Sequence, residues 1–261
     1  MKVLLKIGGT LLDENEPRER LARQIADAAR QVSLVVVHGG GWQMTRYLSA
    51  HGISSQFVNG LRVTTPEVLD AVVKVIAGSV NRQLTVTLNR AGGRAVGISG
   101  IDAGLVEAEE MDPALGSVGR VTQANPALLD ALLAGGFLPV VACVAGGRDG
   151  RIYNVNADQM AVACAAALGA DKLIFLTDVE GVLDTGRRLL SHVTLERSQS
   201  LIAEGIATGG MLAKLNAAAT ALRQGVPEVR IAAGNAEGVV GRILSGENIG
   251  TRLSDQEVCA Q

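Results

Sequence analysis

The sequence predicts an α/β protein, a three-layer αβα sandwich built around a mostly parallel central sheet. Short apolar, β-branched runs alternate along the 261 residues with longer segments of helical periodicity. The runs are continuously apolar rather than apolar at every second position, as expected of strands covered on both faces. Glycines follow several of these runs, at the edge where a parallel sheet carries its ligand-binding loops.

Strands and helices are expected to alternate along the whole chain. The strand candidates are Val3–Ile7, Leu34–Val37, Ala95–Ile98, Leu138–Ala142, Leu173–Leu176 and Val229–Ala232. Helical patterns lie near residues 18–31, 42–51, 66–90, 126–135, 157–168, 194–204, 211–224 and 237–245. Residues 104–124 are polar and lack helical periodicity, so we expect a β-hairpin beside the main sheet there.

We expect a single domain, residues 1–261, in which two lobes share one sheet. No low-complexity tract, internal repeat or Pro/Ser-rich linker divides the chain, and its length suffices for a substantial core. The expected join lies near residues 168–171, which gives one lobe of residues 1–168 and another of residues 169–261.

Composition excludes several classes of protein. With 24 Lys plus Arg against 26 Asp plus Glu, the formal charge is −2, which argues against a nucleic-acid partner held by a basic face. A hydrophobic content of 48% and a charged content of 19% exclude intrinsic disorder. The longest uncharged stretch, residues 131–147, is shorter than the roughly 20 residues of a membrane helix. We therefore expect a cytoplasmic protein with neither a nucleic-acid nor a membrane partner.

The three cysteines predict neither disulfides nor a zinc site. Cys143, Cys164 and Cys259 lie far apart, and no CxxC pair or Cys/His cluster with metal-ligand spacing accompanies them. We expect them to be small buried hydrophobic residues in a reducing compartment.

Known phosphate-binding and hydrolase motifs do not fit. The chain has no GxxxxGK[ST] and no GxGxxG at its first helix, which argues against P-loop and dinucleotide-binding proteins. The run His38-Gly39-Gly40-Gly41 is similar to an esterase oxyanion loop, but the GxSxG elbow that such enzymes need is absent.

Two lysines stand where a solvated lysine is unexpected. Lys6 interrupts the apolar run VLLKIGG at the carboxyl end of the first strand. Lys214 follows Gly209-Gly210 in what is expected to be the first turn of a helix, where the macrodipole disfavours a cation. Glycine loops at the same edge allow backbone N–H groups to approach an anion. Together these features predict a polyphosphate or acidic substrate.

Three polar positions have ordinary structural alternatives. Asn156 fits a helix N-cap, with Gln159 completing a capping-box-like pair, and Asp158 fits the favourable dipole at a helix start. Arg62 carries the planar donor fork suited to a carboxylate, although a loop arginine in solvent would look the same in sequence.

Taken in order, the motifs resemble those of the amino-acid kinase family, and within it the branch that acts on N-acetyl-L-glutamate. The resemblance covers nearly the whole chain, from Lys6 to Thr251, and NGLRVT with YNVNAD is its most specific part. The matching segments are residues 6–9 (KIGG), 38–41 (HGGG), 59–64 (NGLRVT), 153–158 (YNVNAD), 177–183 (TDVEGVL) and 208–214 (TGGMLAK).

The resemblance implies a kinase of arginine biosynthesis that transfers the ATP γ-phosphate to the side-chain carboxylate of N-acetyl-L-glutamate, giving N-acetyl-L-glutamyl 5-phosphate. One alternative is a kinase for an N-acylated or carrier-linked L-2-aminoadipate in lysine biosynthesis. Another is a non-catalytic ligand-binding member, against which the retention of Lys6, Asp158 and Lys214 counts.

The resemblance also implies roles for individual residues. Lys6 would bind the transferring phosphoryl group, Lys214 would stabilise charge toward the leaving ADP, and Asp158 would organise both lysines. The lobe of residues 1–168 would bind the amino-acid substrate through Gly40, Gly41, Arg62 and Asn154. The lobe of residues 169–261 would bind the nucleotide, and the nucleotide-binding residues would be Gly8, Gly9, Asp178, Val179, Glu180, Gly181, Val182, Leu183, Ile206, Ala207 and Thr208.

This chemistry needs no general base, because a glutamate carboxylate with a pKa of about 4.3 is already ionised at neutral pH. It needs cations and N–H donors that bring two anions together. Residues 178–183 offer no multi-carboxylate cage, so we expect no protein metal site and expect Mg²⁺ to arrive bound to ATP.

Residues 66–90 bear on assembly. Thr65-Pro66-Glu67 fits a helix start, and the apolar residues that follow wrap more than one helical face. The resemblance implies a homodimer formed through this region. It also implies that arginine-inhibited members carry an extra N-terminal helix. With the first strand starting at Val3, we expect no arginine feedback.

Overall fold

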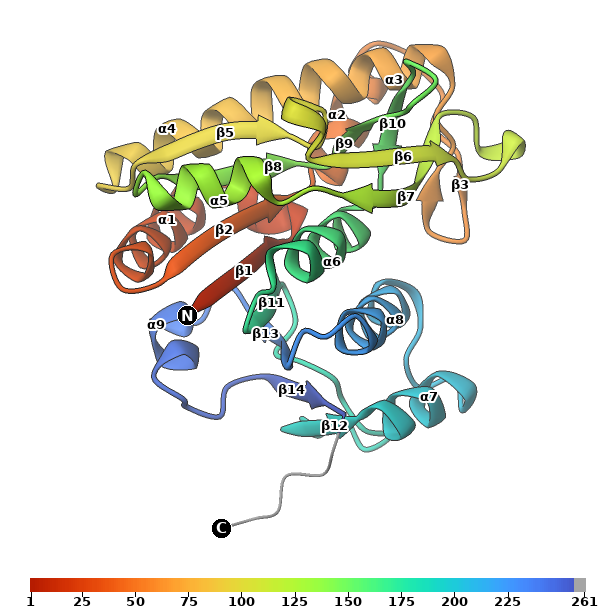
Figure 1. The fold of residues 1–261 in the computed structure, drawn as a ribbon. Helices are drawn as coiled ribbons and strands as arrows, with labels where there is room; N and C mark the ends of the chain where they lie inside the picture. The colour runs from red at the N-terminus through yellow and green to blue at the C-terminus, as the bar shows by residue number, and fades with distance from the viewer. Residues whose placement is uncertain (256–261) are drawn as a thin grey trace.

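The computed structural model describes residues 1–255, and Cys259 lies outside them. Their largest sheet has eight strands in the order β12-β14-β13-β11-β1-β2-β8-β5 (Figure 1). These strands are β1 Lys2–Ile7, β2 Ser33–His38, β5 Ala95–Ser99, β8 Leu138–Ala142, β11 Lys172–Thr177, β12 His192–Thr194, β13 Glu228–Ala233 and β14 Thr251–Ser254.

The six strands expected from the sequence all form, and their pairings to one another are parallel. β14 runs antiparallel to β13, and β12 continues the sheet beyond it. Sequence patterns gave no sign of these two short strands, because both mix polar with apolar residues. Every residue of β8 is buried, as is nearly every residue of β1 and β11, which explains their continuous apolar character.

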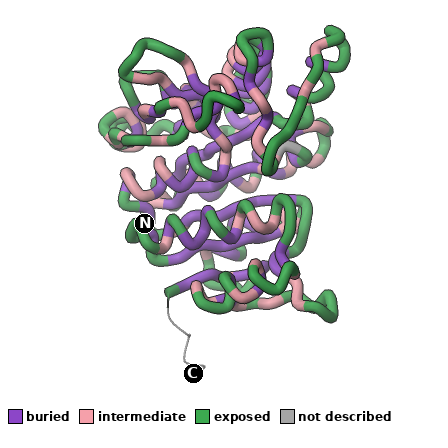
Figure 2. The backbone as a smooth tube through the Cα atoms, turned by 90° about the vertical axis from the view of Figure 1, so that its right-hand side faces the viewer, coloured by how far each residue is buried: buried purple, intermediate pink, exposed green. Residues whose placement is uncertain are grey.

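Helices cover both faces of this sheet and complete the three layers. α1 Asn15–Ala29 packs between α4 Asn81–Arg90 and α9 Val239–Leu244. α6 Ala157–Leu168 packs against β1 and against α8 Gly209–Arg223. Figure 2 shows the buried backbone running through the interior of these layers. The other α-helices are α2 Gly41–Ala50, α3 Pro66–Val72, α5 Ala127–Ala134 and α7 Leu195–Ala203.

The hairpin expected within residues 104–124 forms from β6 Val106–Glu110 and β7 Val118–Ala124. It closes into a small barrel with β9 Val144–Gly146 and β10 Ile152–Val155, in the order β10-β7-β6-β9. A separate hairpin pairs β3 Phe57–Val58 with β4 Leu61–Arg62. Short 3-10 turns are η1 Gly9–Leu12, η3 Asp102–Gly104 and η4 Pro113–Leu115.

The long helix expected at residues 66–90 is not α-helical throughout. The Thr65 hydroxyl caps α3, as its sequence suggests, but Val73–Val80 (η2) forms a π-helix before α4 begins. Most of the apolar residues of this helix are buried within the single chain, so less apolar surface is left uncovered than the sequence pattern suggested.

The two cysteines in the described part of the chain are buried residues without a disulfide, as the sequence predicts. Cys143 and Cys164 are free and buried, and burial raises their pKa to about 11 and about 12. Both are therefore protonated thiols at neutral pH.

Among residues 1–255, no helix has the length and apolarity to cross a bilayer.

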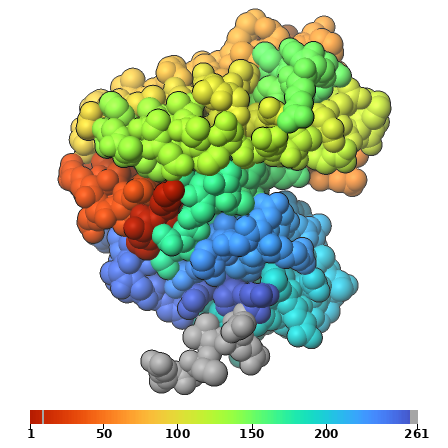
Figure 3. All heavy atoms as spheres, in the orientation of Figure 1, coloured from red at the N-terminus to blue at the C-terminus, as the bar shows by residue number. Residues whose placement is uncertain are grey.

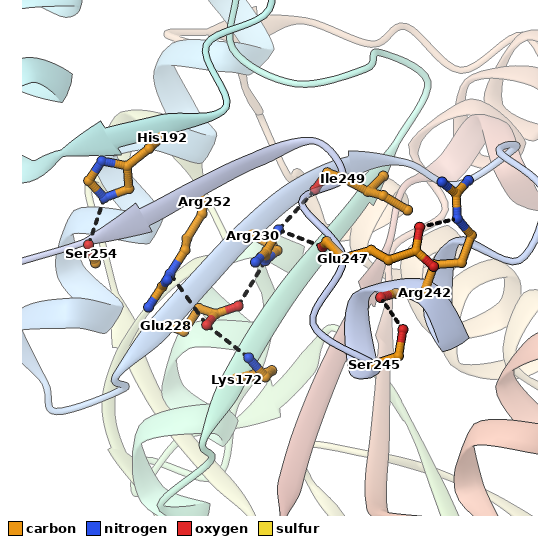
Figure 4. A network of polar contacts seen from close by, with 10 residues as sticks. All are labelled: Lys172, His192, Glu228, Arg230, Arg242, Ser245, Glu247, Ile249, Arg252 and Ser254. Atoms are coloured by element: carbon orange, nitrogen blue, oxygen red, sulfur yellow. Dashed lines mark hydrogen bonds and ion pairs between the residues drawn. The ribbon is translucent and has the colours of Figure 1, made fainter. Parts of the chain in front are cut away.

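A buried ion cluster joins β11, β13 and β14 (Figure 4). The Glu228 carboxylate lies 2.8 Å from Lys172 Nζ, 2.8 Å from Arg230 Nε and 3.4 Å from Arg252 Nε. Arg230 also donates hydrogen bonds to the carbonyls of Glu247 and Ile249. Burial alone would raise the pKa of Glu228, but hydrogen bonds from Arg230 and Lys172 outweigh it and lower that pKa. The cluster therefore stabilises this part of the sheet.

Candidate active site

The candidate site lies where β1, β2 and β11 end. β1 pairs in parallel with both neighbours, so the segments after Ile7, His38 and Thr177 meet at one edge of the sheet. The Gly8 N–H donates to Leu176 O at 2.9 Å, and a Cβ at Gly8 would lie 3.2 Å from that oxygen. Glycine therefore allows the two loops to approach closely.

Lys6, Asp158 and Lys214 form one buried charge cluster at this edge. Lys6 Nζ lies 2.8 Å from Asp158 Oδ1, and Lys214 Nζ lies 3.8 Å from Asp158 Oδ2. The three side chains are 9%, 8% and 14% exposed. Asp158 Oδ1 accepts no hydrogen bond, so its contact with Lys6 is an ion pair that is not aligned as a hydrogen bond. The lysine ammonium groups thus keep donors for a ligand.

Two helices bring these groups together. Asn156 caps α6, its side chain accepting from the N–H groups of Asp158 and Gln159, and this places Asp158 in the first helical turn. α8 begins at Gly209, so Lys214 lies in its second turn rather than its first. Burial lowers the pKa of Lys214, and the Asp158 carboxylate opposes that shift. Asp158 therefore favours the charged form of Lys214 against the effect of burial.

Gly40 and Gly41 lie at the start of α2, where the first N–H groups of a helix have no partner within it. A Cβ at Gly40 would lie 3.2 Å from Ile76 Cγ1, whereas at Gly41 nothing lies within 4 Å. The side of this loop at Gly41 is therefore open to a ligand.

Arg62 is a buried arginine rather than a solvated one, with 8% of its surface exposed. It donates to Gly41 O at 3.1 Å, to Thr45 Oγ1 at 2.8 Å and to the Ser55 hydroxyl. Its guanidinium carbon lies 4.5 Å from the centre of the Phe57 ring. Burial lowers the pKa of Arg62, yet none of the ion pairs of residues 1–255 includes it. It is a buried positive charge beside the glycine loop.

Asn154 lies on β10 and donates to Thr64 Oγ1 at 3.0 Å. Thr64, in turn, is fully buried and donates to Arg62 O at 2.8 Å. Asn154 is thereby linked to the backbone of Arg62. Asn154 and Arg62 are both expected from the sequence, whereas Thr64 is not, because it carries no sequence signal beyond its place in NGLRVT.

Residues 178–183 follow β11 and residues 206–208 precede α8, so both expected nucleotide segments lie beyond β1 on the β11 side. Val182 and Ala207 are 1% and 5% exposed and belong to the hydrophobic core, whereas Val179 is 42% exposed. The Val182 N–H donates to Thr251 Oγ1 at 2.8 Å, a support that the sequence analysis did not identify. Among the candidates, Val182 and Ala207 therefore have a packing role of their own.

A cavity of about 420 Å³ lies elsewhere. It is lined by Met1, Ser33 and Leu138, which stand at the amino ends of β1, β2 and β8, opposite the glycine loops.

Figure 3 shows the surface indented on the right, between the parts coloured orange and blue. In the part of the chain described, no group of three or more His, Cys, Asp or Glu is placed to hold a metal ion.

A parallel sheet whose carboxyl edge carries two buried lysines and several glycines has the arrangement expected of a protein that binds phosphorylated or carboxylate ligands. The family model for the amino acid kinase family matches residues 1–233, and the chain belongs to that family.

Its relatives include an acetylglutamate kinase of Solibacter usitatus, 63% identical over 97% of this chain and 99% of the relative. An acetylglutamate kinase of Geobacillus thermodenitrificans is 44% identical over 89% of this chain and 90% of its own. The crystal structure of smu.665 from Streptococcus mutans superposes with a TM-score of 0.83 at 30% identity, covering 98% of this chain and 99% of that one.

Proposed function

We propose that this protein transfers the γ-phosphoryl group of ATP to the side-chain carboxylate of N-acetyl-L-glutamate. A carboxylate oxygen forms a bond to the γ-phosphorus, the bond from that phosphorus to the β-γ bridging oxygen breaks, and ADP leaves. The products are N-acetyl-L-glutamyl 5-phosphate and ADP. The buried Lys6–Asp158–Lys214 cluster carries this proposal, and the 63% identity to an acetylglutamate kinase supports the choice of acceptor.

The reaction is limited by charge rather than by proton transfer. The acceptor carboxylate is ionised at neutral pH, so no residue has to remove a proton. Lys6 and Lys214 place two ammonium groups where a phosphoryl group would pass between two anions, and such preorganised charge stabilises the transition state. Asp158 holds both lysines and offsets their mutual repulsion.

Recognition of the amino-acid substrate is assigned to residues that come before α6 in the sequence. Arg62 is buried without a carboxylate partner in the described chain, and its fork suits the α-carboxylate of the substrate. Asn154 would bind the same substrate, while Gly40 and Gly41 would donate N–H groups near the transferred phosphoryl group. This set assigns amino-acid binding to the lobe of residues 1–168.

ATP is assigned to the lobe of residues 169–261, together with Gly8 and Gly9. The segments 178–183 and 206–208 border this side of the sheet, and Asp178 and Glu180 are exposed there. Mg²⁺ is assigned to the ATP oxygens and water, because this cation commonly binds through substrate phosphates and a few ligands.

A homodimer is proposed through the helix of residues 66–90. Val86 is 59% exposed, and Leu69, Val73 and Ala77 are half-buried, so part of an apolar surface remains for a second copy. Light scattering on the purified protein should give twice the 27.0 kDa chain mass. Val86→Glu should shift that mass toward the monomer, and an unchanged dimer would assign the contact elsewhere.

The acceptor is tested by measuring ATP-dependent ADP release with N-acetyl-L-glutamate, N-acetyl-L-2-aminoadipate, N-succinyl-L-glutamate and free glutamate. We expect the highest kcat/KM with N-acetyl-L-glutamate. One extra methylene is worth about 1–3 kcal/mol, so weak turnover of the aminoadipate derivative is compatible with the proposal. A higher kcat/KM for aminoadipate would reassign the enzyme to that substrate. If none of the four acceptors supports ADP release, the protein is a non-catalytic ligand-binding member instead.

A further inference from the structure

His38 is a fully buried histidine that the proposed chemistry does not use. It ends β2, immediately before the glycine loop, and none of its surface is exposed. Its Nδ1 lies 2.7 Å from Gly39 O, and its Nε2 lies 3.0 Å from Asn81 Nδ2. Asn81, the first residue of α4, is also fully buried. The pair joins this helix to the backbone of the loop.

The partners determine where each proton lies. Asn81 Nδ2 is 2.9 Å from Val140 O and 3.3 Å from Ile98 O, and carbonyl oxygens only accept, so this atom must be the amide NH₂. That NH₂ also faces His38 Nε2, which must then accept with its lone pair. The ring proton is therefore on Nδ1 and is donated to Gly39 O.

The same contact orients the next peptide group. The described residues contain no cis peptide bond, and in a planar trans peptide the C=O and N–H point in opposite directions. With Gly39 O held by His38, the N–H of Gly40 points away from the ring. Gly39 itself abuts the start of α6, where a Cβ would lie 3.3 Å from Ala157 Cβ, next to Asp158. The loop is thus fixed beside the lysine cluster.

The π-helix supplies the second contact with the loop. Ile76 and Val80 lie where a Cβ at Gly40 would meet them, at 3.2 and 3.5 Å. The Asn81 N–H donates to Ile76 O, five residues back, at the point where π-helix gives way to α-helix. One helical segment therefore contacts the loop directly through apolar side chains and, one residue further on, contacts His38 through the Asn81 amide. π-Helical turns are frequent at functional sites.

We propose that His38 and Asn81 are positioning residues, which fix the Gly39–Gly40 peptide so that the Gly40 N–H faces the transferred phosphoryl group. This inference rests on the proposed function. It assigns a role to the histidine of the HGGG segment that is neither acid nor base, since the ring is fully buried and both of its nitrogens already have protein partners. The loop donors are oriented before the substrate binds, which lowers the reorganisation needed in the transition state.

The experiment compares three replacements at one position. His38→Phe removes both ring hydrogen bonds and keeps much of the volume. His38→Asn keeps a donor near the Nδ1 position, and His38→Gln keeps an acceptor near the Nε2 position without that donor. We expect kcat with N-acetyl-L-glutamate to fall about 10- to 100-fold in the Phe and Gln variants, because small misplacements at a reacting centre have effects of this size. His38→Asn should recover most of the rate, and KM for ATP should stay within about twofold.

Asn81→Leu tests the second partner, with Asn89→Leu as its matched control. Asn89 lies on the same helix and bonds the backbone of Ala95, at 2.7 and 3.2 Å, without contacting the glycine loop. Asn81→Leu should lower kcat as His38→Phe does, and Asn89→Leu should leave it near the wild-type value. Thermal melts on every variant identify any that fail to fold, and the His38→Asn and His38→Gln pair then provides the comparison.

A measurement without turnover tests the proton assignment. Nitrogen-15 NMR of labelled wild-type protein at neutral pH should show a histidine protonated at Nδ1 alone, whose signal disappears in His38→Gln. The inference is overturned if the wild-type enzyme is active and His38→Phe has the same kcat. It is also overturned if the His38 ring is protonated at Nε2. A wild-type enzyme inactive on every acceptor overturns the proposed function instead.

Discussion

Two buried carboxylates in this molecule each contact more than one cation. The two clusters differ in where they lie in the sheet and in the hydrogen bonds that the carboxylate accepts. Asp158 lies between Lys6 and Lys214, and Glu228 lies among Lys172, Arg230 and Arg252. Charge count alone does not distinguish the two clusters, since both carry more cations than carboxylates.

Location and hydrogen bonding distinguish them. Lys172 and Glu228 are the first residues of β11 and β13, so their cluster lies at the amino edge of the sheet, away from the glycine loops. Glu228 is hydrogen-bonded by two cations, Arg230 and Lys172, and Arg230 also donates through Nη1 to two backbone carbonyls. Asp158 Oδ1 has an ion pair but no hydrogen bond. The Asp158 cluster lies at the carboxyl edge and keeps donors for a ligand, whereas the Glu228 cluster lies at the amino edge and its carboxylate is hydrogen-bonded by the protein, with Arg252 Nε adding an ion pair without a hydrogen bond.

The largest expected effect is the loss of a site lysine. Lys6→Ala or Lys214→Ala should lower kcat by about 10²–10³, the range seen when one preorganised donor is removed from a transition state. KM for both substrates should change less. The matched control is Lys172→Ala, which removes a lysine from an ion pair of equal length, 2.8 Å, in the Glu228 cluster.

Initial rates give kcat for all three variants, and circular dichroism shows whether each is folded and at what temperature it unfolds. Lys172→Ala should keep kcat near the wild-type value while lowering the unfolding temperature. If folded Lys6→Ala turns over as fast as the wild type, the assignment of this cluster to catalysis is wrong.

The converse prediction concerns Glu228. Glu228→Gln should destabilise the protein by about 3 kcal/mol, because it leaves three cations without their carboxylate in a buried setting. The kcat should stay within about twofold of the wild type, since the cluster lies at the other edge of the sheet. Urea unfolding gives the first quantity and initial rates the second. A large loss of kcat in a folded variant would show that the two edges are coupled.

A smaller effect is expected for Arg62→Lys. A single ammonium cannot reproduce the bidentate fork, so KM for N-acetyl-L-glutamate should rise about 10-fold, while KM for ATP stays within about twofold. The matched control is Arg230→Lys, at a buried arginine of the Glu228 cluster, which should lower stability and leave both KM values unchanged. Equal weakening of both substrates in Arg62→Lys would indicate that Arg62 supports the loop rather than a ligand.

The sheet was predictable because its signal is local. Strands such as β1 and β8 are buried on both faces, so their apolar runs stand out without knowledge of their neighbours. β12 and β14 gave no such signal, because each is short and lies toward the sheet edge with polar residues such as His192 and Arg252. The π-helix was unpredictable for another reason, since its apolar residues also fit an ordinary α-helix.

The site was predictable where the chemistry is unusual in its local setting. A lysine inside an apolar strand indicated Lys6, and a helix start indicated the cap at Asn156 that places Asp158. The contacts of Asn81 could not be inferred, because an asparagine in a helical stretch looks like a surface residue and its partners lie 17 to 59 positions away. The sequence places His38 in the HGGG segment but predicts no role for its ring, since nothing in the sequence shows what that ring touches.

The smallest predicted effect is the pH dependence that the Glu228 cluster gives to the free energy of unfolding. Glu228 has a folded pKa below its ordinary value of 4.5, so its contribution is present above pH 4.5 and is lost as pH falls through the folded pKa. Glu228→Gln has no such titration, so its deficit against the wild type should be constant from pH 7.5 to 5.5 and should narrow below pH 4.5. Burial lowers the pKa of His38 to about 4, so the contribution of this residue to the free energy of unfolding is also lost as pH falls from 6.5. That loss is the same in both proteins and cancels in the difference between them. Urea unfolding of the two proteins at matched pH values measures the deficit directly. If the deficit stays constant down to pH 3.5, Glu228 is not held as a carboxylate by its neighbours, and the contrast with Asp158 rests on location alone.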